Sequence, residues 1–371
     1  MRQEYNLRIE KIEAVLRNRL PEYPDPSWTA QVFLSTPSVS PELVKSLTGP
    51  GRDLIHRGGK RWRPLLMTLV CESLGGGNAA LPLVPLVEFC HNASLIHDDI
   101  EDGSGERRGG PAVHLIHGLD TALNGGCFLY FLALHCIDSW AAPEELKNQV
   151  YSLWAVQMRR LHLGQAMDIR WHRDPSSLPG IDEYLAMTAL KTGSLARLAA
   201  CLGVITAMPA LSTAFASPDV HDEDKESYRF AEVVEKLSSG FGDAAEKLGI
   251  GFQILDDVKN LSTGNPGKER GDDVVEGKKS LPVLLYLHRK PERRDLVLRC
   301  FSAAKAGGAG VPEVKELVEA LETEGVLQEA ASRGHELIRE GGEYLGAMRV
   351  SGISLHEEGR RLLAGFTDFI V

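Results

Sequence analysis

The sequence lacks the patterns that mark several classes of protein. Its formal net charge is −10 over 371 residues, whereas nucleic-acid-binding proteins usually carry a basic stripe. The six cysteines form no CxxC pair, which disfavours zinc motifs and a compact disulfide framework and indicates free thiols in a reducing compartment. No run of 18 apolar residues is present, and the charged N-terminus lacks a signal-peptide core. We therefore expect a soluble, cytoplasmic protein with no transmembrane segment and no nucleic-acid partner.

Strand patterns are also nearly absent, and helical spacing of apolar residues recurs along most of the chain. The proline-rich stretch 21–50 predicts a loop with at most short helices. No linker of domain-separating length follows it, so we expect one all-α domain over 51–371, preceded by an N-terminal helix and loop in 1–50. Helices are expected at 51–74, 82–101, 112–140, 143–171, 181–207, 224–262 and 279–289, with three or four more after 312.

Two acidic clusters each end an apolar helix. Asp98 and Asp102 are four residues apart, so on a helix they share one face, and Asp99 lies beside them. The second cluster repeats this spacing at Asp256 and Asn260, with an amide in the last place. Mg²⁺ prefers one or two carboxylates together with waters and substrate phosphates. One such cluster alone is more often a solvated helix face, but two of them with basic neighbours indicate metal binding.

Basic residues accompany both clusters. The stretch "GGKRWRP" places three cations at a glycine-flanked helix start, where free backbone N–H groups favour anions. Two arginines follow the first cluster, a lone lysine lies in the apolar stretch "ALKTGSLARLA", and two lysines follow the second cluster. These residues are Lys60, Arg61, Arg63, Arg107, Arg108, Lys191, Lys268 and Lys278. Carboxylates suited to Mg²⁺ and cations suited to phosphate together predict a diphosphate ligand, and the apolar helices predict that it carries an apolar tail.

The motifs resemble those of the trans-isoprenyl diphosphate synthases (the polyprenyl synthetase family), and are closest to geranylgeranyl diphosphate synthases. The resemblance runs from about residue 51 to 290 through "GGKRWRP", "HNASLIHDDIEDGSGERRGGPAVH", "GQAMDIRW", "KTGSL", "GFQILDDVKN" and "GDDVVEGKKSLP". It implies the class I isoprenoid synthase fold, a single large helical domain around a central cavity, assembled as a homodimer. It also implies Mg²⁺-dependent condensation of isopentenyl diphosphate with dimethylallyl, geranyl or farnesyl diphosphate.

The resemblance assigns roles to individual positions. Asp98 and Asp102, supported by Asp99, would bind two Mg²⁺ ions, and Asp256 would hold a third. Side chains for the allylic diphosphate would be Arg107, Lys191 and Lys268, with Lys278 nearby, and those for isopentenyl diphosphate would be Lys60, Arg63, His91 and Arg108. Thr192 and Gln253 would lie beside the reacting carbons, where their oxygens stabilise a cation.

Two departures from the family pattern qualify these roles. Asn260 replaces the final Asp of the second motif, so we expect a weaker or water-mediated ligand there. The C-terminal "TDFIV" lacks the basic end that closes the site in some farnesyl-type members. Asp272 and Asp273 are expected in a lid rather than at the metal site.

Product length in this family depends on the floor of the cavity. Ala93 lies five residues before Asp98, about 7.5 Å down a helix, where short-chain members often place an aromatic residue. The small side chain implies a product longer than fifteen carbons. Tyr130, Phe131 and His162 resemble the floor of eukaryotic-type geranylgeranyl diphosphate synthases and predict a twenty-carbon product, although ordinary core packing explains them equally well.

Four alternatives remain open. A longer-chain polyprenyl synthase would need that floor to be absent or displaced. A class I terpene cyclase needs no second diphosphate site, so "GGKRWRP", His91 and Arg108 argue against it. A metal-dependent phosphohydrolase could use the "HDD" at 97–99 but leaves the second cluster and the lysines unexplained. A non-catalytic partner subunit usually loses one acidic cluster, and this chain keeps both.

Overall fold

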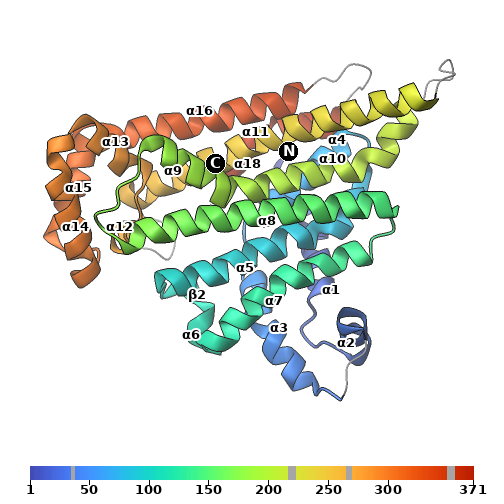
Figure 1. The fold of residues 1–371 in the computed structure, drawn as a ribbon, viewed down its shortest axis with the longest axis horizontal. Coiled ribbons are helices and arrows are strands. Elements are labelled where there is room, and N and C mark those ends of the chain that lie inside the picture. Colours follow the sequence, from blue (N-terminus) through green and yellow to red (C-terminus); the bar gives the residue numbers. More distant parts are fainter. Residues whose placement is uncertain (35–37, 216–222, 265–269, 349–355) are drawn as a thin grey trace. The chain divides into compact units, whose positions relative to one another are not determined.

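The computed structural model describes residues 1–34, 38–215, 223–264, 270–348 and 356–371, and these are almost entirely helical. The all-α prediction is confirmed (Figure 1). The α-helices are α1 (Arg2–Arg19), α2 (Pro26–Phe33), α3 (Pro41–His56), α4 (Trp62–Ser73), α5 (Val84–Asp102), α6 (Val113–His117), α7 (Leu119–Asp138), α8 (Glu144–Arg173), α9 (Ile181–Thr188), α10 (Ser194–Phe215), α11 (Glu223–Ser262), α12 (Asp272–Val275), α13 (Leu281–Arg289), α14 (Arg294–Gly307), α15 (Pro312–Thr323), α16 (Val326–Ala347), α17 (Glu357–Ala364) and α18 (Thr367–Ile370).

The remaining elements are short. Two 3₁₀ helices, η1 (Gly77–Leu83) and η3 (Pro291–Arg293), and one π-helix, η2 (Ala189–Gly193), connect longer helices. Strands β1 (Glu106–Arg107) and β2 (Gly110–Pro111) form an antiparallel ribbon directly after α5. This ribbon turns the chain back on itself just after the first acidic cluster.

The proline-rich segment 21–50 contains one short helix, α2, as the sequence analysis allowed, and the start of α3, which at 16 residues is longer than the short helices expected there. Pro26 and Pro41 each occupy the first position of their helix, α2 and α3. Proline is tolerated there because the backbone N–H that it lacks would have no partner within the helix. The helix expected at 51–74 is interrupted after His56, where Gly58 and Gly59 take positive φ angles before α4 begins.

The chain forms two compact units, each built from segments far apart in the sequence. Unit 1 comprises Met1–Val156, Arg197–Asp243 and Glu343–Ile370, and unit 2 comprises Gln157–Ala196, Ala244–Gly342 and Val371. Helices α8, α10, α11 and α16 each contribute residues to both units. The N-terminal segment 1–50 lies within unit 1.

Unit 1 has a core in which α5 and α7 lie side by side (Figure 1). Helix α4 is buried on nearly every face, as expected for an apolar helix at the centre of a packed unit. Glycines allow close contact between helices α3 and α7: a Cβ atom at Gly51 would lie 2.7 Å from the Leu129 side chain, and one at Gly125 would lie 2.9 Å from Pro50. The packing of α3 on α7 therefore depends on these two small residues.

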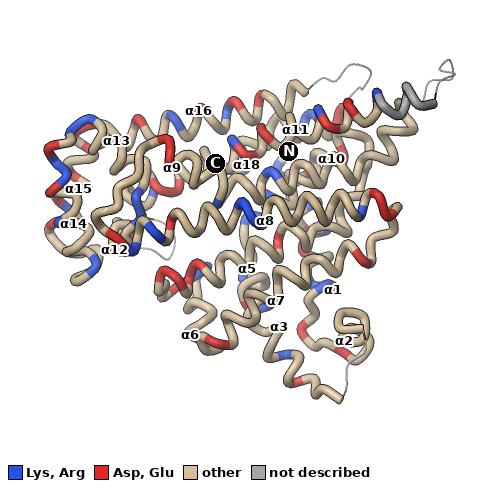
Figure 2. The backbone as a smooth tube through the Cα atoms, viewed as in Figure 1, with Lys and Arg blue, Asp and Glu red and all other residues tan. Residues whose placement is uncertain are grey.

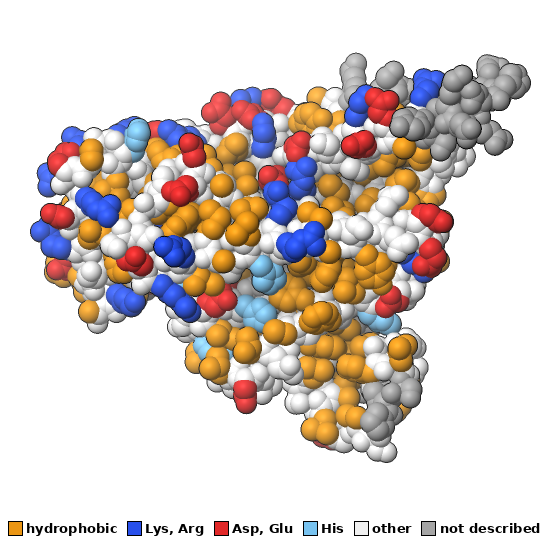
Figure 3. Space-filling model, viewed as in Figure 1, with side chains coloured by type: hydrophobic (Ala, Val, Ile, Leu, Met, Phe, Trp, Pro, Cys, Tyr) orange, Lys and Arg blue, Asp and Glu red, His pale blue; other side chains and the backbone are white. Residues whose placement is uncertain are grey.

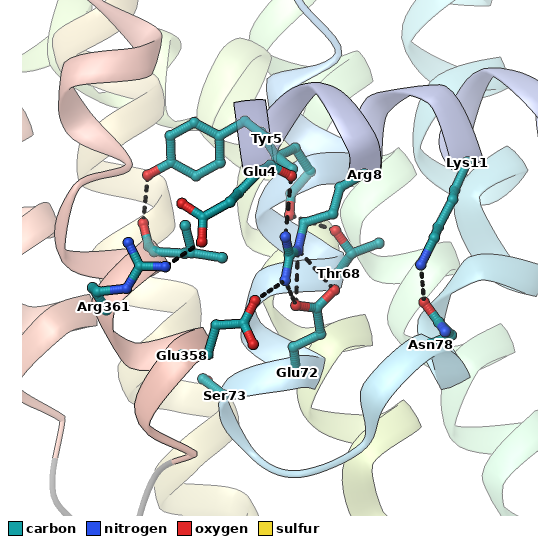
Figure 4. Close-up of polar contacts among 12 residues, drawn as sticks. Glu4, Tyr5, Arg8, Lys11, Thr68, Glu72, Ser73, Asn78, Glu358 and Arg361 are labelled. Atoms are coloured by element: carbon teal, nitrogen blue, oxygen red, sulfur yellow. Dashed lines mark hydrogen bonds and ion pairs between the residues drawn. The ribbon is translucent and has the colours of Figure 1, made fainter. Parts of the chain in front are cut away.

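The N-terminal helix ties the C-terminal helix α17 to α4 within unit 1 (Figure 4). The buried Tyr5 hydroxyl donates a 2.7 Å hydrogen bond to the Leu362 carbonyl. Arg8 donates to Glu72 of α4 at 2.6 Å and to Glu358 of α17 at 3.2 Å. Because one arginine bridges two acids and most of its side chain is covered, this network contributes more than an isolated surface ion pair would.

Unit 2 has its own apolar core around α13. Six consecutive residues of this helix, Leu281–Tyr286, are buried, and Leu317 of α15 and Phe301 of α14 belong to the same cluster. Tyr184 of α9 and Ile254 of α11 join it. This core fixes the helices that carry the second acidic cluster.

Two helical stretches are long and apolar enough to cross a membrane by length and composition. They are Gly77–Asp102 and Ile181–Phe215, and 67% and 61% of their apolar windows are buried inside the protein. Burial of this kind is what the core helices of a soluble protein show.

Candidate functional site

Three aspartates of unit 1, Asp98, Asp99 and Asp102, lie in the last turn of α5 together with Glu101, where Figure 2 shows acidic residues gathered. Gly103, with a φ of 65°, ends the helix immediately after Asp102. The C-terminal end of a helix already carries partial negative charge, so acidic side chains are unfavourable there without a cation. Asp98 is partly exposed, whereas Asp99 is fully buried. The cluster therefore requires positive charge from elsewhere.

Arg107 supplies part of that charge. The β1–β2 ribbon carries it back to α5, where its Nε donates to Asp99 Oδ1 at 2.8 Å. The same guanidinium lies 3.5 Å from Asp98 Oδ2. Burial raises the pKa of the Asp99 carboxyl, and the hydrogen bond from Arg107 opposes that rise. Asp99 thus holds Arg107 beside Asp98, which is the geometry that a supporting role for Asp99 requires.

Asp98 and Asp102 fit a particular kind of metal site. Among the residues that the structure describes, no three His, Cys, Asp or Glu side chains are grouped to hold a metal ion. A protein-enclosed site, such as structural zinc, is therefore a poor fit to the described chain. Mg²⁺ commonly binds one or two carboxylates and completes its octahedron with waters and phosphate oxygens. The two carboxylates of α5 suit that second arrangement.

A group of arginines lies at the start of α4 in unit 1. Arg61 has a positive φ of 50° and is fully paired: it donates to Glu13 at 2.6 Å, to Glu88 at 2.5 Å and to the Ile55 carbonyl at 2.5 Å. Burial lowers the pKa of Arg61, but the two acids outweigh it and raise the pKa, so the guanidinium stays charged. Arg61, a cation in the predicted anion motif, is therefore structural.

Arg63 and Arg108 have a different environment. Arg108 donates to the Leu54 carbonyl at 3.0 Å and to Asn92 Oδ1 at 2.9 Å, and Arg63 lies 3.4 Å from His91 Nε2. Within the described part of the chain neither guanidinium forms an ion pair with a carboxylate. Burial lowers the pKa of both to about 10, so both stay charged at neutral pH. A buried cation, Arg63, and a partly buried one, Arg108, whose hydrogen-bond partners are neutral, would be stabilised by an anion.

His91 belongs to the same group. Burial, together with the positive charges of Arg63, Arg108, Arg61 and Arg107, holds its pKa well below the usual value. The imidazole is therefore neutral at physiological pH and can donate one hydrogen bond. The structure thus brings three predicted anion-binding residues, Arg63, His91 and Arg108, into one neighbourhood.

Lys60 contacts the C-terminus of the chain. Its Nζ donates to the Ile370 carbonyl at 3.0 Å, and the preceding Phe366 ring lies 6.5 Å from that of Trp62. The last five residues, 367–371, include no basic side chain. Their contribution to this region is a backbone carbonyl oxygen, which accepts a hydrogen bond from Lys60. Lys60 is thereby held at the start of α4.

In unit 2, Lys191 and Thr192 lie in the π-helix η2, inside what the sequence predicted as one regular helix at 181–207. A π-helix adds one residue to the turn and is frequent at functional sites. Lys191 Nζ lies 2.6 Å from Asp168 Oδ2 of α8. Asp168 was not predicted as a site residue, although it belongs to the quoted motif "GQAMDIRW".

Glycines of neighbouring helices make room for this π-helix. A Cβ atom at Gly164 of α8 would lie 2.4 Å from the Lys191 backbone nitrogen, and one at Gly249 of α11 would lie 2.9 Å from the Gly193 Cα. Only glycine permits backbones to approach this closely. The position of Lys191 and Thr192 is therefore set by contacts of backbone against backbone.

Thr192 and Gln253, predicted to act together, are hydrogen-bonded to each other. The Thr192 hydroxyl donates to Gln253 Oε1 at 3.1 Å, and Gln253 Nε2 donates to Asp257 Oδ1 at 2.9 Å. The buried Tyr184 hydroxyl donates to Asp257 Oδ2 at 2.7 Å. Burial and the charge of Asp273 raise the pKa of the Asp257 carboxyl to about 7. Sequence reasoning missed Asp257 and Tyr184, because nothing in the motif separates a buried second aspartate from an exposed one.

The second acidic cluster lies on α11. Asp256 is exposed, whereas Asn260 is completely buried. Asn260 Oδ1 accepts a hydrogen bond from the Asp273 backbone N–H at 3.2 Å, and its carbonyl accepts from Gly271 at 3.1 Å. Its side chain thus anchors the start of α12, and a role of Asn260 toward substrate or a metal-bound water stays a prediction.

Of the two predicted lysines that follow this cluster, the structure describes only Lys278. Lys278 Nζ lies 2.6 Å from Glu276 Oε2 and 3.9 Å from Asp273 Oδ1, so it is held against α12. Lys268 lies outside the described residues.

The predicted floor residues of unit 1 do not share one environment. Ala93 of α5 is fully buried and Tyr130 of α7 is 8% exposed, but Phe131 is 67% exposed. Successive residues of a helix point about 100° apart, so only one of the two aromatics can face α5. In the single chain Tyr130 is covered and Phe131 is exposed, so a shared floor of both aromatics stays a prediction. One turn before Ala93, Cys90 Sγ accepts a 3.2 Å hydrogen bond from the Trp154 indole of α8.

His162, the third predicted floor residue, lies in unit 2. Its Nδ1 is 2.8 Å from the Met158 carbonyl one turn earlier on α8, and its side chain is largely exposed. Its part in setting product length stays a prediction.

The fold and these clusters together define a class of protein: an all-α protein that presents carboxylates for a divalent ion and buried or partly buried arginines for an anion. The family model for polyprenyl synthetases matches residues 44–218 and 227–321. The chain therefore belongs to the polyprenyl synthetase family.

Individual relatives agree with this membership. A geranylgeranyl pyrophosphate synthase of Neocamarosporium betae is 32% identical over 302 residues, which cover 79% of this chain and 78% of the relative. A geranylfarnesyl diphosphate synthase of Aeropyrum pernix is 30% identical over 347 residues, covering 90% and 95%. The crystal structure of a geranylgeranyl pyrophosphate synthetase from Pyrococcus horikoshii Ot3 superimposes with a TM-score of 0.74 at 26% identity, covering 100% of this chain and 97% of that one.

Proposed function

We propose that the protein is a prenyltransferase that condenses isopentenyl diphosphate with an allylic diphosphate and releases a longer trans-prenyl diphosphate, geranylgeranyl diphosphate in particular. One observation carries this proposal. Arg63 is a buried cation and Arg108 a partly buried one, both have neutral partners in the described chain, and the carboxylates of α5 lie in the same unit. Such a unit supplies an anion site and a divalent-cation site together, which is the chemistry that diphosphate substrates need.

The anion group is proposed to hold the diphosphate of isopentenyl diphosphate. Arg63 and Arg108 supply fixed positive charge, and neutral His91 supplies a hydrogen bond without adding charge. Lys60 joins them when its bond to the Ile370 carbonyl yields to a phosphate oxygen. A charged acceptor forms the stronger hydrogen bond, so this exchange is favourable.

The allylic diphosphate is proposed to bind through Mg²⁺ ions held by the aspartates of the two acidic clusters. By the roles that the family motifs assign, Asp98, Asp102 and Asp256 would hold Mg²⁺, with three ions per active site. When bound, these ions neutralise the negative charge that develops on the departing diphosphate. Side chains assigned to the same diphosphate are Arg107, Lys191, Lys268 and Lys278.

The reaction then needs three bond changes. The allylic C–O bond breaks and its electron pair leaves with the diphosphate, which creates an allylic cation. The double bond of isopentenyl diphosphate attacks that cation and forms the new C–C bond, and the departing diphosphate takes the proton that is lost. Thr192 and Gln253 contribute oxygen lone pairs beside the cation, and apolar surroundings keep water from capturing it.

A twenty-carbon product is proposed from the neighbourhood of Ala93. Its small, buried side chain leaves the first turns below Asp98 open to a growing chain, and Tyr130 and the Cys90–Trp154 pair present larger side chains nearby in unit 1. Relatives named geranylgeranyl synthases support this length, while the geranylfarnesyl relative marks the alternative of a longer product.

We also propose a homodimer in the cytoplasm. Figure 3 shows hydrophobic side chains gathered over α6 and α7, and large exposed apolar residues of these helices are Leu115, Ile116, Leu119, Leu123 and Phe131. An apolar surface of this kind marks an interaction site. Light scattering at micromolar concentration should give twice the 40.6 kDa chain mass, and Leu119→Glu should lower the measured mass toward that of a single chain.

The cytoplasmic location is proposed from the cysteines. All six are free, which suits a reducing compartment.

The test of function is incubation of purified protein with isopentenyl diphosphate, Mg²⁺ and each of the three allylic primers. A prenyl diphosphate longer than the primer supports the proposal. Turnover of the primer to a hydrocarbon without use of isopentenyl diphosphate would indicate a cyclase instead. Elongation only after a second synthase is added would indicate a partner subunit.

A further inference from the structure

The hydrogen-bonded chain in unit 2 has a fixed direction. It runs from the Thr192 hydroxyl to Gln253 Oε1 at 3.1 Å, and from Gln253 Nε2 to Asp257 Oδ1 at 2.9 Å. Tyr184 donates to the other oxygen of Asp257 at 2.7 Å. Asp257 and Tyr184 are almost completely buried. These four residues all belong to unit 2, so the chain is complete within it.

Asp257 determines the direction of these hydrogen bonds. Its carboxylate oxygen can only accept, so it takes a hydrogen from the Gln253 amide nitrogen. A carboxylate facing an amide accepts from its nitrogen, which turns the amide oxygen away. A proton on Asp257 would sit on the oxygen facing Tyr184, whose hydroxyl can accept as well as donate, so Oδ1 accepts from Gln253 in either charge state. The Gln253 oxygen therefore faces Thr192.

The consequence for Thr192 is chemical. A hydroxyl has one hydrogen and two lone pairs, and the hydrogen of Thr192 is engaged by Gln253. Its lone pairs are then the groups left to face a ligand. Lone pairs stabilise a neighbouring cation, whereas an O–H hydrogen pointed at it would repel it. The direction of the chain thus matches the proposed role of Thr192.

The backbone keeps this arrangement in place. Thr192 lies in the π-helix, against which Gly164 and Gly249 pack closely enough that a Cβ atom would clash with backbone atoms. The hydroxyl therefore has little freedom to turn toward another acceptor. Preorganised dipoles of this kind need no rearrangement at the moment of reaction.

We propose that Asp257 is a positioning residue which, through Gln253, orients the Thr192 hydroxyl so that its lone pairs face the allylic cation. The inference rests on the proposed prenyltransferase function and adds a residue to it. Asp256, beside it in the sequence, is exposed and is the residue proposed to hold Mg²⁺, so the two adjacent aspartates would have separate tasks. Asp256 would act on the departing diphosphate through Mg²⁺, and Asp257 would act on the allylic cation through Gln253 and Thr192.

The proposal is tested by reversing the donor-to-acceptor direction of the hydrogen bonds that join Thr192, Gln253 and Asp257. In Asp257→Asn the Tyr184 hydrogen needs the new carbonyl, so the new amide N–H₂ faces Gln253 and turns its oxygen away from Thr192. We expect kcat with farnesyl diphosphate to fall about tenfold in single-turnover assays, with KM for both substrates unchanged. The swap Gln253→Glu/Asp257→Asn restores an acceptor toward Thr192 with the original volume and charge, and should recover most of kcat.

A second comparison separates orientation from charge. If Asp257 acts through the Thr192 hydroxyl, Asp257→Asn has no further effect on kcat in a Thr192→Val background. If the two losses multiply, or if the swap is no faster than Asp257→Asn, the proposal is overturned. Thermal melts confirm that each variant is folded, and the swap stays informative if the single variant is not. A wild-type protein without elongation would overturn the proposed function itself.

Discussion

The ends of α5 and α11 carry nearly the same sequence motif, yet the two units compensate its buried aspartate differently. In unit 1 Asp99 is paired with a cation, Arg107, at 2.8 Å. In unit 2 Asp257 is held by two neutral donors, Gln253 at 2.9 Å and Tyr184 at 2.7 Å. A carboxylate with a guanidinium partner contributes to binding an anion, whereas a carboxylate with neutral partners orients dipoles. The same spacing thus serves different tasks because the second side chain meets a different environment.

The largest expected effect falls on the exposed members of both motifs. Asp98→Asn and Asp256→Asn each remove one metal-binding oxygen, so we expect kcat to fall about a thousandfold or more in a steady-state elongation assay. Glu106→Gln, which neutralises an exposed carboxylate in the neighbouring β1, should leave kcat unchanged. A mild loss in Asp256→Asn alone would break the equivalence of the two motifs.

Removal of the Arg108 guanidinium should weaken the binding of isopentenyl diphosphate and leave that of the allylic primer unchanged. Arg108→Met deletes a partly buried guanidinium and leaves the Leu54 carbonyl and Asn92 without their donor. We expect KM for isopentenyl diphosphate to rise about a hundredfold, equivalent to about 2.8 kcal/mol, with KM for the allylic primer unchanged. An equal rise for both substrates would show that the group does not discriminate between them.

Loss of the cation from the unit 1 pair should reduce stability. Arg107→Gln leaves Asp99 buried without a charged partner, so we expect the free energy of unfolding at pH 7 to fall by about 2 kcal/mol. Urea denaturation measures it. Arg107→Gln/Asp99→Asn removes both charges and should regain much of the loss, and failure to regain it would mean that Arg107 acts elsewhere.

Loss of one neutral donor from the unit 2 group should have a smaller effect. Tyr184→Phe removes one of the two hydrogen bonds to Asp257 and keeps the ring in the core. We expect about 1 kcal/mol less stability by the same measurement. A loss larger than that of Arg107→Gln would reverse the comparison between the two pairs.

A further expected effect concerns the dependence of stability on pH. The folded-state pKa of His91 lies well below the unfolded value near 6.5, so protonation favours the unfolded chain. The stability that depends on neutral His91 is present above pH 6.5 and is lost as the pH falls. Between pH 7 and pH 5 the unfolding free energy should drop less in His91→Gln than in the wild type. An equal drop in both would show that other groups carry the dependence.

Much of this arrangement could be predicted from sequence, because apolar periodicity reveals helices and a four-residue spacing reveals a shared face. The pairing of Thr192 with Gln253 and the grouping of Arg63, His91 and Arg108 followed from motifs of the family. Spacing does not reveal which part of a face is later covered. Asn260 shares a helix face with Asp256, yet α12, folded back from later in the chain, buries only Asn260.

Other features were beyond sequence reasoning for related reasons. The π-helix depends on Gly164 and Gly249 of two other helices, which no local pattern around Lys191 indicates. Phe131 follows Tyr130 directly, and periodicity alone did not show which of them faces α5. The length of α3 in the proline-rich segment was underestimated because proline was taken as a breaker, although at the first position it begins a helix.

The most direct test of the central claim is the mass of the product formed from farnesyl diphosphate and isopentenyl diphosphate, with Mg²⁺ and again with excess chelator. The account predicts a twenty-carbon diphosphate in the first case and unchanged substrates in the second. Absence of any elongated product from folded, Mg²⁺-supplied protein would contradict it.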